Sequence, residues 1–138
     1  MSWANSLIKL STYEVEVLQK RLGEITDRRL AAEQKLEDLE QEGMIEAARA
    51  RQDAENGWYQ LGFWEGLRAR KAHAQSEIER IRAEEAGARD ALALAFEDQK
   101  KYEQVAENIR QQRAKAQGRY EAAVMDEISL RMAAGGRR

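Results

Sequence analysis

Apolar residues recur every three or four positions over most of this chain, a spacing that predicts helices rather than strands. In the first half they occupy the a and d positions of a heptad repeat, which form the seam of a coiled coil. These seam positions are Ile8, Ser11, Val15, Leu18, Leu22, Ile25, Arg29, Ala32, Leu36 and Leu39. We expect the register to slip at Gly43, because the following positions come one residue late. They are Met44, Ala47, Arg51, Ala54, Trp58 and Leu61.

A second seam in the other half of the chain runs without a break. Its positions are Ala74, Ile78, Ile81, Glu85, Ala88, Leu92, Ala95, Gln99, Tyr102, Ala106, Ile109, Arg113, Ala116, Tyr120, Ala123, Glu127 and Leu130. Sustained alternation of β-branched or aromatic residues with polar ones, which would indicate strands, is missing from the sequence. The pattern therefore predicts an all-α fold with few and long elements.

The strongest turn signal lies between the two seams, at Asn56-Gly57. Three glycines, Gly57, Gly62 and Gly66, follow within ten residues, and each costs about 1 kcal/mol in a helix interior. We therefore predict a single coiled-coil hairpin over residues 1–138. Its parts are a first helix over about 3–56, a reversal over about 57–62, a second helix over about 63–134 and a frayed tail over 135–138.

Alternative registers of the two seams can be compared by pairing them antiparallel and asking which residues lie opposite each other. In an antiparallel pair the numbers of opposing residues have a constant sum, and a sum near 117 sets Leu39 against Ile78. That register leaves Arg29 and Glu85 in adjacent layers, whereas sums near 110 or 124 set a charge against hydrocarbon. Residues from about Gln117 onward then have no partner. The predicted fold is a long antiparallel two-helix coiled coil, a helical hairpin, with a C-terminal helical overhang.

The composition excludes several classes of protein and of functional site. The chain has 35% charged residues, a formal net charge of -2, no Pro and no Cys, which is typical of a long helix or coiled coil. Thiolate zinc sites and disulfides are excluded, and His73 is the only histidine. No nucleophile or phosphate-binding motif occurs. We expect His73 to be an exposed helix residue, and we expect no enzymatic activity, cofactor or metal.

Two surfaces are candidate partner sites. Four of the nine aromatic residues gather at the predicted tip, at Trp58, Tyr59, Phe63 and Trp64. They either plug the end of the hairpin or dock a partner, and we expect Trp58 or Leu61 to point inward and Phe63, Trp64 and Leu67 partly outward. The overhang is the second candidate, with the apolar residues Tyr120, Ala123, Val124, Met125, Ile128, Leu130 and Met132. It either inserts into a partner, or is partly disordered or packs in an oligomer, and an anionic membrane surface is a weaker fit.

The segment Leu7-Ile8-Lys9-Leu10-Ser11-Thr12-Tyr13-Glu14 resembles the N-terminal L-I-x-L-x-x-x-E of the flagellar export protein family FliJ. The tip, with Tyr59, Phe63 and Leu67, is similar to the aromatic stretch that opens the second helix of that family. Length, absence of proline and two-helix layout agree over nearly the whole chain. This sequence departs from the family pattern in its glycine-rich tip and at Gly43.

The resemblance implies a non-catalytic stalk in flagellum assembly and motility. Both termini would enter the hexameric ring of the flagellar export ATPase, another part would contact the cytoplasmic domain of the export gate protein, and export chaperones could bind. The residues assigned to the ring are Trp3, Ile8, Arg119, Tyr120, Val124, Met125, Ile128 and Arg131. Those assigned to the gate are Trp58, Tyr59, Phe63, Trp64 and Leu67. The protein would be cytoplasmic, peripheral to the inner membrane through its partners.

Other functions stay open at this point. An injectisome secretion stalk shares the layout, and a generic coiled-coil chaperone or adaptor would hold a client with its aromatic tip. A binder of nucleic acid or membrane would use the basic residues Arg110, Arg113, Lys115, Arg119, Arg131, Arg137 and Arg138. The acidic residues Glu103, Glu107 and Glu121 lie among these basic residues and reduce the local positive charge. We therefore expect no nucleic-acid partner.

Overall fold

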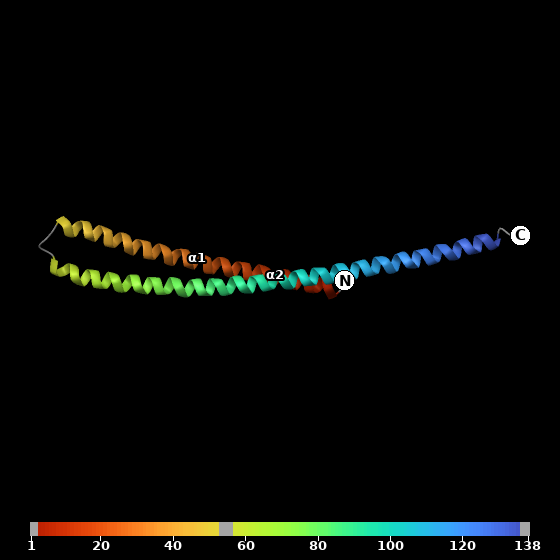
Figure 1. The fold of residues 1–138 in the computed structure, drawn as a ribbon, viewed down its shortest axis with the longest axis horizontal. Coiled ribbons are helices and arrows are strands. Elements are labelled where there is room, and N and C mark those ends of the chain that lie inside the picture. Colours follow the sequence, from red (N-terminus) through yellow and green to blue (C-terminus); the bar gives the residue numbers. More distant parts are fainter. Residues whose placement is uncertain (1–2, 53–56, 136–138) are drawn as a thin grey trace. The chain divides into compact units, whose positions relative to one another are not determined.

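The computed structural model describes the backbone of residues 3–52 and 57–135 and the side chains of the same residues except 57–59. Residues 1–2, 53–56 and 136–138 lie outside the described part. Helix α1 spans Trp3–Gln52 and helix α2 spans Gly57–Gly135 (Figure 1). Every residue in the described ranges is helical and none is in a strand, so the predicted all-α fold is confirmed.

The chain divides into two compact units, and each contains parts of both helices. The first, here called the paired unit, is Glu14–Leu94, in which α1 and the first part of α2 run antiparallel (Figure 1). The second, here called the terminal unit, joins residues 3–13 to residues 95–135. The predicted antiparallel packing of two long helices is confirmed, whereas the division into two units was not predicted.

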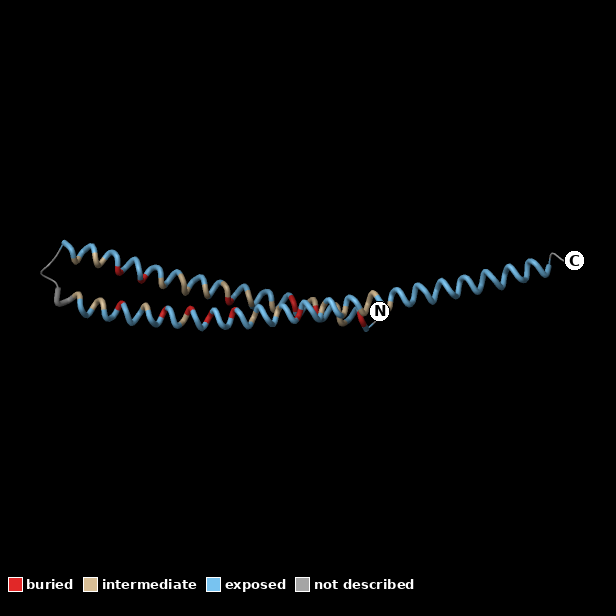
Figure 2. The backbone as a smooth tube through the Cα atoms, viewed as in Figure 1, coloured by how far each residue is buried: buried red, intermediate tan, exposed pale blue. Residues whose placement is uncertain are grey.

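The core of the paired unit is one residue wide on each helix. Buried positions recur at intervals of three or four along the facing sides of the helices (Figure 2). The buried apolar residues are Val15, Ile25, Leu39, Leu67, Ala74, Ile78 and Ile81. All of these except Leu67 are predicted seam positions, so both predicted seams are confirmed here. A core this thin depends on every layer, because each side chain touches few others.

One buried layer of the paired unit is ionic. The Glu85 side chain is 6% exposed, and its Oε2 accepts a hydrogen bond from Arg29 Nε at 2.7 Å. Its Oε1 pairs with Arg89 at 2.9 Å, so both carboxylate oxygens have a cationic partner. Arg29 also pairs with Glu33 at 3.1 Å. A buried carboxylate without such partners would be strongly destabilising, and the layer therefore holds the two helices at one longitudinal position.

These ion pairs correct the predicted register. In the paired unit, Arg29–Glu85, Arg28–Glu84 and Arg82–Glu33 have residue numbers that sum to about 114, one layer of an antiparallel coiled coil below 117. The prediction placed Arg29 and Glu85 in adjacent layers in order to maximise apolar matches. In the structure they share a layer, because their direct contact offsets the cost of burying Glu85. The shift changes the buried apolar area of the alanine-rich seam only a little.

The predicted slip at Gly43 is wrong. Helix α1 runs through Gly43, which is buried, while Met44 is 73% exposed and Arg51 is exposed. A Cβ at Gly43 would lie 2.9 Å from Cδ2 of Leu67 and 3.5 Å from Cζ3 of Trp64. Gly43 thus occupies a seam position at which the large side chains of α2 fill the space that its own side chain lacks, and the register needs no slip.

The predicted reversal over about 57–62 is also wrong, because α2 begins at Gly57 and these residues are helical. Gln60, Phe63 and Trp64 are half-buried, and Leu67 is buried, at spacings of three or four. This apolar spacing extends the helix through Gly57 and Gly62 despite the cost of about 1 kcal/mol for each glycine. The described part of the first helix extends to Gln52, and its predicted end near residue 56 lies outside the described residues.

In the terminal unit, residues 3–13 of α1 pack against α2. Ala4, Ser11 and Ala95 are buried, and Gln99 Nε2 donates a hydrogen bond to Thr12 Oγ1 at 3.0 Å. All residues of α2 from 110 to 135 are exposed. The overhang therefore exists but begins about seven residues before the predicted Gln117, a difference in the direction that the corrected register requires. Neither described helix has a stretch apolar enough to span a membrane.

Candidate partner-binding surfaces

The last part of α2 has no covering element within the terminal unit. We call residues 111–135 the bare segment, and each of them is exposed (Figure 2). Its large apolar side chains keep much of their surface accessible: Tyr120 66%, Val124 36%, Met125 61%, Ile128 44%, Leu130 72% and Met132 72%. An exposed apolar face of this size is typical of a surface that binds a partner.

Some of the large apolar residues of the bare segment follow one side of the helix, whereas Leu130 lies on another side. Tyr120, Val124 and Ile128 are four residues apart, which stacks them on one face, and Met132 extends the row. The segment has its own polar support, since Arg131 pairs with Glu127 at 2.8 Å and Gln117 donates a hydrogen bond to Glu121 at 3.1 Å. Five of the predicted ring residues, Tyr120, Val124, Met125, Ile128 and Arg131, lie together here, as does Arg119.

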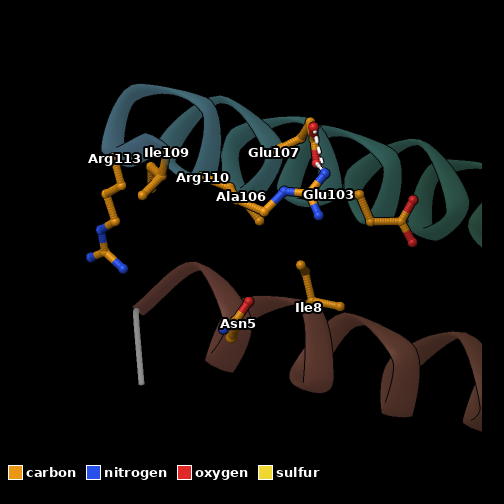
Figure 3. A pocket seen from close by; sticks show the side chains of 8 residues that line it. All are labelled: Asn5, Ile8, Glu103, Ala106, Glu107, Ile109, Arg110 and Arg113. Carbon is orange, nitrogen blue, oxygen red and sulfur yellow. Dashed lines mark hydrogen bonds and ion pairs between the residues drawn. The ribbon is translucent and has the colours of Figure 1, made fainter. Parts of the chain in front are cut away.

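A groove of about 340 Å³ lies where α1 begins, within the terminal unit. We call it the terminal groove, and Figure 3 shows Asn5 and Ile8 of α1 on one side and α2 side chains on the other. The α2 residues are Glu103, Ala106, Glu107, Ile109, Arg110 and Arg113. A hydrogen bond from Arg110 holds the pKa of Glu107 below its ordinary value. Aliphatic side chains between a carboxylate and guanidinium groups suit a mixed apolar and charged partner.

The predicted ring residues of α1 lie in the same unit. Ile8 is half-buried and lines the terminal groove, and Trp3 is 61% exposed. Leu10 and Tyr13 are 63% and 66% exposed, and they were not predicted as site residues. Leu10 lies seven residues after Trp3, and Tyr13 three residues after Leu10. Trp3 and Leu10 come one position before the buried Ala4 and Ser11. These exposed residues form a second apolar heptad row beside the seam, which the sequence contains but does not distinguish from a wider core.

The tip differs from its prediction. Leu67 is 2% exposed and belongs to the core with Leu39 and Ala74, so the expectation that it points outward is wrong. Gly43 leaves room for its side chain, which explains the burial. Phe63 and Trp64 are half-buried, pack on this core and contact each other edge-to-face with centroids 5.3 Å apart. Leu61, expected inward as an alternative to Trp58, is 68% exposed.

The side chains of Trp58 and Tyr59 lie outside the described residues, so their predicted roles stay predictions.

A second groove runs along one side of the paired unit. This lateral groove has a volume of about 350 Å³ and is lined by Lys35, Leu39, Ala69, Arg70 and His73. The short side chain of Ala69 opens it, and the buried Leu39 contributes to its floor. His73 is exposed, as predicted, and also lines a neighbouring groove of about 180 Å³. Lys35 lies beside this aliphatic floor, and Arg70 is paired with Glu42 at 3.3 Å, so the groove suits a partner with an apolar anchor and polar groups around it.

Two residues of the predicted basic stripe pair with acids, while Arg113, Lys115 and Arg119 lie in a stretch, 111–120, that contains no acidic residue. Arg110 pairs with Glu107 at 2.6 Å and Arg131 with Glu127 at 2.8 Å. Paired guanidinium groups of this kind give no continuous basic stripe for a phosphate backbone. Arg137 and Arg138 lie outside the described part of the chain.

Comparison with known proteins agrees with this geometry. The family model described as "Flagellar FliJ protein" matches residues 5–138. A relative named "Flagellar FliJ protein" from Caulobacter vibrioides (strain NA1000 / CB15N) is 52% identical over 136 residues, covering 99% of this chain and 98% of the relative. The protein of the same name from strain ATCC 19089 / CIP 103742 / CB 15 matches equally. No solved structure matches. The chain therefore belongs to the flagellar FliJ protein family.

Proposed function

We propose that this chain is a non-enzymatic stalk of the flagellar export apparatus, which inserts its terminal unit into the hexameric ring of the export ATPase. The observation that supports this most directly is the bare segment, whose apolar face has no partner within the terminal unit. Trp3 and the terminal groove add apolar and charged surface in the same unit. The protein would work in the cytoplasm, at the inner membrane through its partners.

A helix suits this task because it presents side chains at fixed positions. The paired unit holds α2 against α1 through a continuous seam, and the ionic layer at Glu85 opposes sliding of one helix along the other. Proline, which would break a long helix at a cost of about 3 kcal/mol or more, does not occur in the sequence. A stiff pair of helices and an exposed helix with an apolar face each meet a physical need of a stalk.

The ring contact is tested by two matched double variants of the bare segment. Val124→Asp with Ile128→Asp places two carboxylates on the apolar row, and we expect it to abolish co-purification with the flagellar export ATPase. Ala122→Asp with Ser129→Asp adds the same charge to the opposite face and should leave binding intact. Circular dichroism should show equal helicity for both. Retained binding by the first variant would refute the ring contact.

We propose further that the paired unit contacts the cytoplasmic domain of the export gate protein. The lateral groove, with an aliphatic floor and the cationic Lys35 and Arg70, is the support for this contact, and the half-buried Phe63 and Trp64 extend the accessible apolar surface. Trp58 and Tyr59 stay candidates for the same contact. Export chaperones would bind other exposed parts of the chain.

Ala69→Lys would fill the lateral groove with a long cationic side chain. We expect loss of binding to the purified gate domain and reduced motility in soft agar, with ATPase binding unchanged. Ala83→Lys adds the same side chain at an exposed position that does not line the lateral groove, and it should behave as wild type. Equal gate binding by the two variants would refute this contact without touching the ring proposal.

A further inference from the structure

A further groove lies within the paired unit, with a volume of about 670 Å³. The spacing of its lining residues along α1 and α2 places it on the other side of the seam from the lateral groove. Among its eight lining residues four are acidic and one is basic, whereas no acidic residue lines the lateral groove. We call it the acidic groove, and its charged residues are Glu33, Glu37, Glu40, Glu79 and Arg82.

The carboxylates of the acidic groove are only partly neutralised within the chain. Glu33 pairs with Arg29 at 3.1 Å and with Arg82 at 3.0 Å, so the one basic residue of the groove already has a partner. The other three carboxylates are exposed and form no ion pair within the described ranges. They belong to Glu37, Glu40 and Glu79. The groove therefore keeps negative charge that an incoming cation could neutralise.

Apolar surface forms the floor of the acidic groove and continues beyond it. Ile78 is 4% exposed and Leu36 is half-buried, and both line the groove. On α1 the acidic residues lie three or four positions apart, on one side of the helix. Leu30 and Met44, 52% and 73% exposed, continue this row at its two ends, about 21 Å apart along the helix axis. The row is thus apolar at both ends and acidic in between.

This arrangement selects the chemistry of an occupant. A groove between two packed helices receives a third helix, which lays an apolar face into it through residues three or four positions apart. Lysine or arginine beside that face would pair with the free carboxylates. An acidic helix, a nucleic acid or an anionic membrane would be repelled, and a wholly apolar helix would bury carboxylates that have no partner.

We infer that the acidic groove binds a basic amphipathic helix of a partner protein, which packs as a third helix along the paired unit. The lateral groove stays open on the other side of the seam, so two partners of different chemistry can bind together. The inference goes beyond the proposed function, because neither the ring contact nor the gate contact uses this surface.

The first experiment titrates the full chain into a fluorescent synthetic helix of about 20 residues, with leucines along one face and lysines beside them. We expect micromolar binding that weakens as salt increases. Glu37→Gln with Glu79→Gln should weaken it about tenfold. Glu24→Gln with Glu65→Gln removes the same charge from exposed positions outside the groove and should leave binding nearly unchanged. Equal effects of the two pairs would overturn the inference, because net charge alone would then explain the binding.

The second experiment tests the apolar end of the row with two neighbouring residues. Met44→Gln should weaken binding of the same peptide about threefold, whereas Ile45→Gln should have no effect, because Ile45 is 56% exposed on another side of α1. Circular dichroism checks that the variants keep their helicity. Equal affinities of these two variants would also contradict the third-helix arrangement.

Two further controls identify the occupant. The peptide with glutamates in place of its lysines should not bind, and binding as tight as that of the basic peptide would overturn the inference. Sedimentation equilibrium of the chain alone should give 15.8 kDa at every concentration. Self-association that Glu37→Gln with Glu79→Gln abolishes would mean that a second copy fills the groove, which would overturn it as well. None of these readouts uses the ATPase or the gate domain, so failure here is distinguishable from failure of the proposed function.

Discussion

The paired unit and the bare segment contain similar apolar residues, which are buried in the first and exposed in the second. Leu67 in the paired unit is 2% exposed and Leu130 in the bare segment is 72% exposed, while Ile78 and Ile128 are 4% and 44% exposed. Local apolar spacing predicts a helix in both regions, and the difference is the presence of a second helix. Apolar residues of the paired unit should therefore contribute to stability, whereas those of the bare segment should contribute to binding.

The largest expected contrast comes from truncating one leucine in each region. Leu67→Ala leaves a cavity in the core with Leu39 and Ala74, and we expect it to reduce the free energy of unfolding by about 2–5 kcal/mol. Leu130→Ala should change it by about 0.5 kcal/mol or less, because Leu130 has no covering element. Urea denaturation followed by circular dichroism measures both. Equal effects would mean that the bare segment is covered in the free protein.

A second contrast tests close packing within α1. Gly43→Val would force side-chain atoms onto Leu67, and we expect a loss of about 1–3 kcal/mol in stability. Gly23→Val meets no atom within 4 Å of its Cβ, so it should be neutral or slightly stabilising, because glycine is the poorer helix former. Thermal melting of the two variants provides the measurement. A neutral Gly43→Val would show that α1 and α2 are farther apart than described.

A third contrast uses acid. Hydrogen bonds from arginines hold the pKa values of Glu33 and Glu85 below their ordinary value of 4.5, Arg82 acting chiefly on Glu33 and Arg29 on Glu85. Since the unfolded chain then binds more protons than the folded one, this stability is fully present above pH 4.5 and is lost as pH falls through the lowered pKa values. We expect the melting temperature to fall on acidification below that point.

Glu85→Gln should flatten this acid dependence, and Glu24→Gln, which removes one exposed charge from α1, should not. An acid dependence that survives Glu85→Gln unchanged would place its origin outside the ionic layer. In the bare segment the ion pair between Arg131 and Glu127 is exposed on both sides and contributes little to stability.

Much of the fold followed from spacing alone. The seams from Ile8 to Leu39 and from Ala74 to Ile109 are buried or half-buried as predicted, because a strict three-four repeat admits one buried face. The extent of the candidate ring surface, with Tyr120 and Ile128 exposed, followed from unequal arm lengths. Leu10 and Tyr13 were missed because a second heptad row beside the first is indistinguishable from a wider core until the partner helix is placed.

The sequence by itself determined the helices, the two seams and the existence of an uncovered C-terminal segment, since each depends on residues close together along one helix. The tertiary structure decided the register and the burial of Gly43 and Leu67. These depend on contacts between residues far apart in sequence. In an alanine-rich seam, neighbouring registers differ little in buried apolar area, so a single pairing such as Arg29 with Glu85 selects among them.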